Sequence, residues 1–217
     1  MKILGRRLLD ELSSRARTSP RLRAHHNFHE SLDEPCQRLV IAMEPGSYLQ
    51  PHRHLVHAKP ELFVVLRGSV VVLLFSDAGD IIGSHALSPD GATLGFQVPP
   101  GVWHTAVSLK EGSAFMEVKP GPYQAVAPED QAAWAPAEGA SGAGSYLEKL
   151  SAEARSLCGD QHQLRAKCWK PQPAGQAVFW PAASHGRSKR NLTFVPSVPR
   201  AQRAVIDCHE EPCSDQD

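Results

Sequence analysis

Residues 46–68 read GSYLQPHRHLVHAKPELFVVLRG, and residues 98–108 read VPPGVWHTAVS. In a β-strand, residues two positions apart point to the same face of the sheet. His52 and His54 are therefore expected to present two imidazoles side by side, with Arg53 pointing away. The apolar runs in both stretches are bounded by Pro and Gly, which is typical of short strands. Together the two stretches predict a β-sheet protein with paired histidines on one strand face.

A carboxylate and a third imidazole accompany this pair. Glu61 opens the run ELFVVLR and shares a strand face with Phe63 and Val65. A carboxylate at the end of an apolar, inward-facing row costs free energy unless it meets a cation. His104 follows the turn PPG and begins another strand, from which it can complete a coordination shell.

Three imidazoles and one carboxylate make a mixed nitrogen and oxygen site that suits Fe(II), Mn, Zn, Ni or Co. We therefore predict a single divalent metal ion, with one or two positions left open for a ligand. The predicted ligands are His52, His54, Glu61 and His104. His57 is an alternative to His54 or Glu61 if the hairpin between them folds differently.

The rest of the sequence up to about residue 120 indicates an all-β architecture. Seven or eight short β-branched or apolar runs alternate with Pro, Gly, Asp and Ser, which predicts a sandwich or barrel. Residues 69–75, SVVVLLF, are apolar on both strand faces, so this strand must be covered on two sides. The cover is either an opposing sheet and a helix or a second subunit, and a homodimer is expected.

Both histidine stretches resemble the two sequence motifs of the cupin superfamily. The first motif is matched by Gly46, His52, His54, Glu61 and Gly68, and the second by Pro99, Gly101 and His104. Six residues separate His54 from Glu61 where the family has three or four, and Ser108 stands where Asn is usual. The resemblance implies a double-stranded β-helix, the cupin or jelly-roll barrel, and assigns the metal to the same four side chains.

A second resemblance, over about residues 15–150, is to the WbuC family of cupin-fold metalloproteins. It rests on the runs SPRLR, NFH, QRL, PGSY, PHRH, KPE, GVWHT, EVKPGPY and WAP-x-E. Bacterial members are associated with gene clusters for O-antigen and other surface polysaccharides. The resemblance therefore implies a role in polysaccharide or O-antigen metabolism.

The chain divides into four segments by its composition. Residues 1–29 are expected to form an N-terminal helix and a lid segment, and residues 30–120 the cupin barrel. Residues 121–158, rich in Pro, Gly and Ala before a helical pattern, are expected to form an irregular wrap and a helix. Residues 159–217 carry weak periodic signals and are expected to be a largely disordered tail.

Several side chains near the predicted ligands are candidates for contact with a substrate. Tyr48, His57 and Arg67 are candidate catalytic residues, and Arg67, with the parity of Glu61 on its strand, can bind a carboxylate or phosphate. The candidate substrate-binding residues are Asn27, His29, Lys59 and Trp103. Each of them, taken alone, also fits a packing or surface role.

Composition narrows the possible partners. Lys and Arg together number 23, as do Asp and Glu, so no net field attracts nucleic acid or an anionic membrane. The start MKILGRRLLDELSSRAR lacks the uninterrupted apolar run of a secretory signal, and the five scattered cysteines do not form a disulfide framework. We expect a cytoplasmic protein whose partner is a small molecule, with no nucleic-acid or membrane partner.

These features predict a metal-binding cupin that acts on a sugar or small oxygenated acid as an isomerase or epimerase. The metal would polarise an oxygen of the substrate while a nearby side chain moves a proton. Three alternatives stay open: a module that binds or senses a small molecule without chemistry, an Fe(II) dioxygenase, and a metal-free structural barrel.

Overall fold

The structure is a computed structural model that describes residues 1–160 of the chain. This part contains helix α1 (Arg6–Thr18), helix α2 (Ala143–Asp160), the short 3-10 helix η1 (Pro128–Asp130) and eight strands. The predicted tail, residues 159–217, lies from residue 161 onward outside the described residues. None of the helices described is long and apolar enough to cross a membrane.

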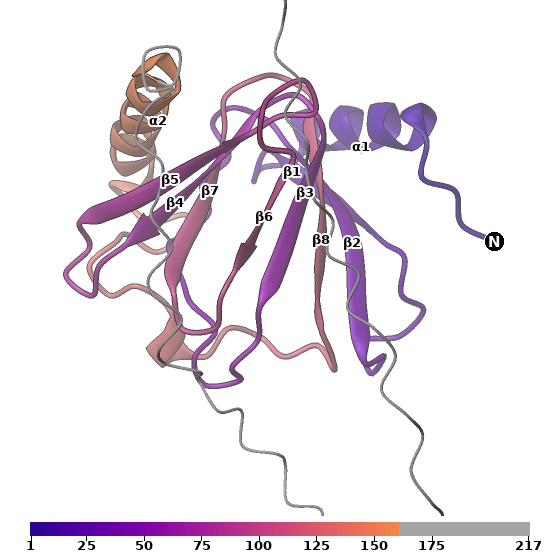
Figure 1. Ribbon diagram of the computed structural model, residues 1–217, viewed down its shortest axis with the longest axis horizontal. Coiled ribbons are helices and arrows are strands. Elements are labelled where there is room, and N and C mark those ends of the chain that lie inside the picture. The colour runs from indigo at the N-terminus through magenta and orange to yellow at the C-terminus, as the bar shows by residue number, and fades with distance from the viewer. Residues whose placement is uncertain (161–217) are drawn as a thin grey trace, which may run out of the picture. The chain divides into compact units, whose positions relative to one another are not determined.

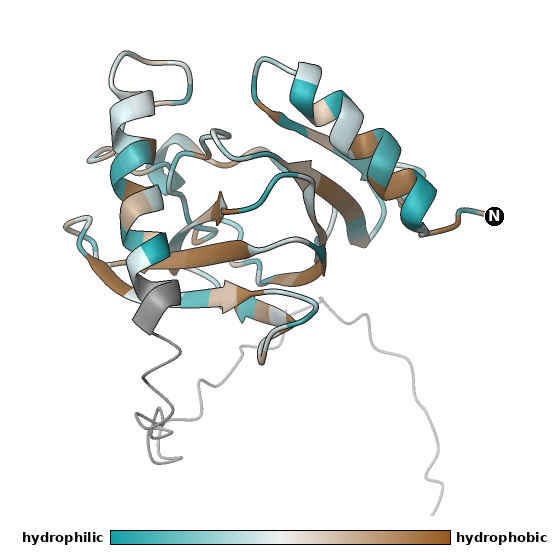
Figure 2. Ribbon diagram, turned by 90° about the horizontal axis from the view of Figure 1, so that it is seen from above, coloured by the Kyte–Doolittle hydropathy of each residue, from teal (hydrophilic) through white to brown (hydrophobic). Residues whose placement is uncertain are grey.

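The strands form two antiparallel sheets, one of five strands and one of three (Figure 1). The larger sheet has the order β1 (Arg23–Asn27), β2 (Cys36–Met43), β8 (Ser113–Pro120), β3 (Glu61–Arg67), β6 (Gly95–Val98). The smaller sheet has the order β5 (Ile81–Leu87), β4 (Val70–Phe75), β7 (Trp103–Ser108). Figure 2 shows long hydrophobic stretches on strands of both sheets, which pack against each other.

The connections identify the fold as a jelly roll. His52 forms a single bridge to His104 on β7 and so adds a rudimentary strand beside the smaller sheet. With that bridge included, strand neighbours run β2-β8-β3-β6 in one sheet and His52-β7-β4-β5 in the other. Successive strands after β2 therefore alternate between the sheets, except for the hairpin β4–β5 within the smaller sheet, which is the pattern of a double-stranded β-helix. The predicted all-β fold class is confirmed.

Strand β4 is buried on both faces, as its sequence predicted. Val70 and Val72 point into the core between the two sheets. Val71 and Leu73 point outward and pack in a second core, to which α2 contributes Leu147. The outer cover of β4 is thus a helix of the same chain, so this strand gives no reason to expect a second subunit.

Helix α1 packs on the outer face of the larger sheet. Leu9, Leu12 and Ala16 are spaced three and four residues apart, so they form one apolar stripe that is buried against β2 and β8. Complete burial of Leu12 contributes about 1.5–3 kcal/mol to this contact. The helix begins at Arg6, so Leu4 precedes it and is exposed.

Candidate metal centre

Backbone pairing brings the predicted ligands to one end of the barrel. The backbone N–H of His52 donates to the carbonyl oxygen of His104 at 3.0 Å, and the N–H of His104 donates back to the carbonyl of His52 at 2.8 Å. Glu61 is the first residue of β3 and pairs with Val98 on β6, and the turn that follows Val98 leads to His104. In that turn the N–H of Gly101 donates to the carbonyl of His54 at 3.2 Å. Strand pairing and backbone hydrogen bonds therefore position all four side chains.

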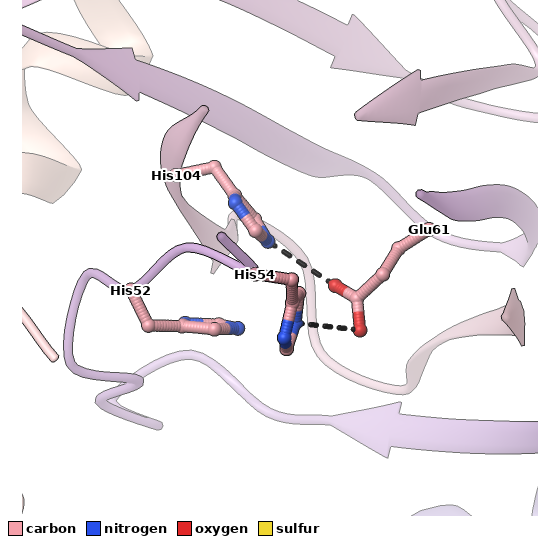
Figure 3. A group of neighbouring side chains, drawn as sticks. All are labelled: His52, His54, Glu61 and His104. Atoms are coloured by element: carbon pink, nitrogen blue, oxygen red, sulfur yellow. Dashed lines mark hydrogen bonds and ion pairs between the residues drawn. The ribbon is translucent and has the colours of Figure 1, made fainter. Parts of the chain in front are cut away.

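The four side chains point toward a common position (Figure 3). Each of His52, His54, Glu61 and His104 offers one ligand atom, and these atoms all lie within 4.8 Å of one another. Nε2 of His54 is 2.9 Å from Oε1 of Glu61, and Nε2 of His104 is 3.2 Å from Oε2 of Glu61. Separations of this size fit ligands that share one ion, because each bond to such an ion is about 2.0–2.3 Å long.

The hydrogen bonds of the imidazoles orient their Nε2 atoms toward this position. Nδ1 of His104 is 2.9 Å from the carbonyl oxygen of Val102, and Nδ1 of His52 is 3.1 Å from that of Gln50. A carbonyl oxygen only accepts, so Nδ1 of both rings carries the proton and, in the neutral ring, Nε2 has a free lone pair. Burial lowers the pKa of His52 to about 3, so that ring is neutral at physiological pH.

The contacts of Glu61 indicate whether a cation fits between the four candidate ligands. The buried Nε2 of His54 has no partner with hydrogen-bond geometry among the described residues, although it is 2.9 Å from the carboxylate. Nε2 of His104 likewise faces Oε2 of Glu61, at 3.2 Å. Lone pairs that face a carboxylate repel it unless a proton or a metal ion lies between them. The donor set and its orientation therefore fit a divalent metal ion.

A lysine and a second carboxylate adjoin Glu61 on strand β8. Lys119 Nζ lies 2.8 Å from Oε1 of Glu61 and 2.6 Å from Oε1 of Glu117. Glu117 is paired with Phe63 across β3 and β8, so it faces the barrel interior as Glu61 does. Glu117 and Lys119 were not among the candidate residues selected from the sequence. Their parity with the inward-facing Phe115 was the signal that identifies them.

Electrostatic effects keep Glu61 and Lys119 charged. Burial disfavours the Glu61 carboxylate, but the adjacent imidazoles of His104 and His54 and the charge of Lys119 hold its pKa well below the ordinary range. Burial also acts against the Lys119 ammonium, yet the carboxylates of Glu117 and Glu61 outweigh it and raise its pKa. Burial, with the negative charge of Glu61, raises the pKa of Glu117. Glu117 is thus the carboxyl group of this cluster that most readily takes up a proton.

The cluster forms one wall of a cavity of about 270 Å³ inside the barrel, which we call the central cavity. Its apolar walls come from strands β2, β3 and β8 of the larger sheet and include Leu39, Ile41, Met43, Phe63 and Phe115. The other polar side chains that line it are Arg21, Arg23, Glu117, Lys119, Tyr123 and Gln124. At the volume of about 30 Å³ that a water molecule occupies, the space holds about nine non-hydrogen atoms. A small polar ligand fits it.

The predicted catalytic residues lie away from this cavity. Tyr48 is buried in the outer core, where its hydroxyl donates to the carbonyl of Pro136 at 2.7 Å. His57 lies in the turn between His54 and β3 and does not line the central cavity. The longer hairpin noted in the sequence is accommodated by this turn, which Asp130 anchors by accepting the N–H groups of residues 55 and 56 at 2.9 Å.

Arg67 lies on the opposite face of β3 from the one that we expected. The strand parity that we used to place it beside Glu61 is broken by a bulge between Val65 and Arg67. Val65 pairs with Phe115, which faces inward, whereas Arg67 pairs with Ala114, which packs under α1. Its guanidinium bonds to the carbonyl oxygens of Leu9 and Gly112 at 2.8 and 2.7 Å and therefore ties α1 to the sheet.

The four predicted substrate-binding residues lie in and just after β1, before β3 and at the start of β7. The indole N–H of Trp103 donates to Asp77 at 2.9 Å, and its ring packs in the outer core. Lys59 donates to the carbonyl of Pro122 at 2.5 Å. Asn27 ends β1, and Nδ1 of the buried His29 accepts the backbone N–H of Arg38 at 3.1 Å. None of the four lines the central cavity.

The chain matches one family model and is similar to several solved structures. A family described as a domain of unknown function, DUF6016, matches residues 4–87. No curated protein matches the chain. KdgF from Halomonas sp. is similar in structure, with a TM-score of 0.38 and 20% identity over 49% of this chain and 85% of that one.

Two further solved structures are similar to parts of the chain. Oxalate oxidase in complex with the substrate analogue glycolate has a TM-score of 0.38 and 18% identity, and the match covers 49% of this chain and 55% of that one. A variant of oxalate decarboxylase from Bacillus subtilis has a TM-score of 0.35 and 19% identity, with 46% of this chain and 28% of that one covered. The chain thus spans little more than half of the oxidase and less than a third of the decarboxylase.

Proposed function

We propose that this protein is a metal-binding cupin that acts on a sugar or a small oxygenated acid, by isomerase or epimerase chemistry. The observation that carries the proposal is the convergence of three imidazoles and one carboxylate, with ligand atoms within 4.8 Å of one another, on the wall of a cavity inside the barrel. The resemblance of the sequence to the WbuC family adds polysaccharide or O-antigen metabolism as the setting for this activity.

Isomerisation and epimerisation next to a carbonyl need an electrophile and a group that moves a proton. A divalent ion, when bound, polarises a substrate oxygen. The chain supplies a proton-transfer group in Glu117, because its buried carboxyl has a raised pKa and lines the same cavity as the metal cluster. A carboxyl group whose pKa is shifted toward neutrality can take up and return a proton during turnover. Lys119, 2.6 Å from Glu117, holds that carboxyl in place.

A module that binds a small molecule without chemistry is the second candidate. The observation that favours it is the position of Tyr48, His57 and Arg67, none of which lines the central cavity. If Glu117 serves only to pair with Lys119, the cavity can bind a ligand but lacks a proton-transfer group.

Deuterium exchange separates the two candidates. The full chain, loaded with Mn, Fe(II), Co, Ni or Zn in turn, is incubated in D₂O with a panel of keto-sugars and 2-hydroxy or 2-keto acids. Isomerase or epimerase chemistry replaces a carbon-bound hydrogen next to the carbonyl by deuterium, which is followed by proton NMR. We expect exchange with at least one substrate and one metal.

Glu117→Gln is the diagnostic variant, since the amide keeps the shape of the side chain but cannot accept the proton. It should retain the metal and lose at least about 100-fold in exchange rate, the usual contribution of a general acid or base. Glu11→Gln, on the exposed side of α1, is the matched control and should exchange at the wild-type rate. Metal binding without exchange on any substrate would reject the isomerase proposal and leave the binding module.

A further inference from the structure

Two arginines that the proposed chemistry does not use lie against the central cavity. Arg21 and Arg23 both line it, together with the four side chains of the metal cluster. Both are paired with one carboxylate: Arg21 Nε and Nη2 contact the two oxygens of Glu138 at 2.5 and 2.8 Å, and Arg23 Nη2 contacts one of them at 2.6 Å. Two guanidiniums therefore share a single negative charge.

The backbone between the arginines adopts an uncommon conformation. Leu22 has a φ of +52°, in the left-handed region that a leucine rarely occupies. Its N–H donates to the carbonyl of Ser19 at 2.9 Å, and its own carbonyl accepts from Glu44 at 2.9 Å, so the turn is fixed from both sides. Such local strain is often found at functional sites. Here it places two arginines at the same carboxylate.

Glu138 also lines a second, outer hollow of about 430 Å³. This hollow shares lining residues with the central cavity, namely Arg21, Leu49, His52 and Val126. The two spaces therefore meet at Arg21 and His52. The segment that carries Glu138 continues into Gly139, whose φ is +81° and around which no atom lies within 4 Å of a built Cβ.

The charges around the central cavity balance only without a metal ion. Three cationic side chains, Arg21, Arg23 and Lys119, line the cavity, and three carboxylates pair with them: Glu61 and Glu117 in the cavity lining and Glu138 outside it. Imidazoles that ligate a metal are neutral, so a bound divalent ion leaves an excess of two positive charges. Charge held inside a cavity is stable only when it is compensated. The metal-loaded cavity thus calls for a negatively charged ligand.

We propose that the metal-loaded cavity binds a small organic anion, with one end at the metal cluster and a carboxylate or phosphate at Arg21 and Arg23, where it displaces Glu138. This inference rests on the proposed function and deepens it, because it selects the anionic members of the proposed substrate class over neutral sugars. Paired guanidinium groups suit planar carboxylate and phosphate oxygens. Glu138 acts as an internal competitor that holds the arginines in position until the ligand arrives.

Calorimetric titration of the metal-loaded full chain tests the proposal. The probes are malonate, inorganic phosphate and, as a neutral reference, glycerol. We expect malonate or phosphate to bind and glycerol not to bind, and the preference between the two anions identifies which group the arginines recognise. Metal content is measured before and after each titration, so that removal of the metal by the probe is detected.

Two variants are expected to change the anion affinity in opposite directions. Glu138→Gln removes the competitor and should tighten anion binding about tenfold, whereas Arg21→Gln should weaken it about tenfold, which corresponds to about 1.4 kcal/mol in each direction. Arg21 is largely exposed, so its replacement leaves the fold intact. Glu11→Gln and Arg7→Gln, from an exposed pair on α1, are the matched controls and should bind the anions as the wild type does.

The outcomes separate this inference from the proposed function. A wild-type chain that binds no metal overturns both. One metal per chain, with anion affinity unchanged in Glu138→Gln and Arg21→Gln, overturns the anion site and leaves the metal site standing. Equal affinity for glycerol and malonate overturns the anion site as well.

Discussion

Replacement of Lys119 by methionine is expected to destabilise the metal-free protein by about 3 kcal/mol. Lys119 is the cation nearest to Glu61 and Glu117, at 2.8 and 2.6 Å, and its side chain is only 20% exposed. Methionine fills a similar volume but leaves both carboxylates without a positive partner. Removal of one member of a buried ion pair typically costs about 3–5 kcal/mol, and the partial exposure places this case at the lower end.

Urea unfolding of the metal-free protein, followed by circular dichroism, measures this loss. For a chain of this length it corresponds to a fall in Tm of about 6–12 °C. The double variant Lys119→Met with Glu117→Gln removes one of the orphaned carboxylates and should recover about half of the loss. Arg7→Met removes the cation of an exposed helical pair and should cost at most about 0.5 kcal/mol.

Addition of metal should offset part of the stability that Lys119→Met loses. A divalent ion brings positive charge to Glu61, so it should stabilise Lys119→Met by a larger increment than it stabilises the wild type. A loss below about 1 kcal/mol in the metal-free variant would refute the reasoning, because Lys119 would then not be the cation that neutralises the buried carboxylates. Failure of Glu117→Gln to recover any stability would refute it too.

Three further predictions concern residues outside the metal cluster. Arg67→Ala should lose about 1–2 kcal/mol of unfolding free energy, since it ties α1 to the sheet, and should keep full metal binding in a calorimetric titration. Tyr48→Phe should lose about 1 kcal/mol and leave deuterium exchange unchanged; a loss of exchange would restore Tyr48 to the catalytic group. Partial burial acts to raise the pKa of Glu138, but hydrogen bonds from Arg21 and Arg23 hold it below the ordinary 4.5. The contribution of the Glu138 carboxylate to the free energy of unfolding is therefore present above pH 4.5 and is lost as the pH falls below it. Wild-type stability should therefore drop more steeply on acidification than that of Glu138→Gln, in parallel urea titrations across this range.

The architecture could be predicted because its determinants are local in the sequence. Strand parity placed His52 with His54, and the two-sided apolar run of β4 showed that this strand is covered twice. The cover itself could not be assigned, because the helix that provides it lies far along the chain in α2. Three of the candidate ligands lie near a strand start or in a bridge, where register fixes their direction, and His54 is held by the backbone hydrogen bond from Gly101.

The surroundings of the cluster were harder to predict. Parity fails after Val65, where one bulged residue turns Arg67 to the opposite face of the sheet. Lys119 shares the parity of the inward-facing Phe115, but the sequence alone does not show that β8 lies next to β3 and thus beside Glu61. The ion pair between Arg21 and Glu138 joins residues 117 positions apart, and no local sequence pattern predicts such a contact.

Metal content of the purified full chain, compared with that of His104→Ala, tests the central claim most directly. Both proteins are freed of metal, reconstituted with Mn, Fe(II), Co, Ni or Zn, passed over a desalting column and analysed by inductively coupled plasma mass spectrometry. We expect about one metal ion per wild-type chain and a large loss of affinity, about 100-fold or more, in the variant. A wild-type chain that retains none of the five metals, or a variant that retains a full equivalent, would contradict the central claim.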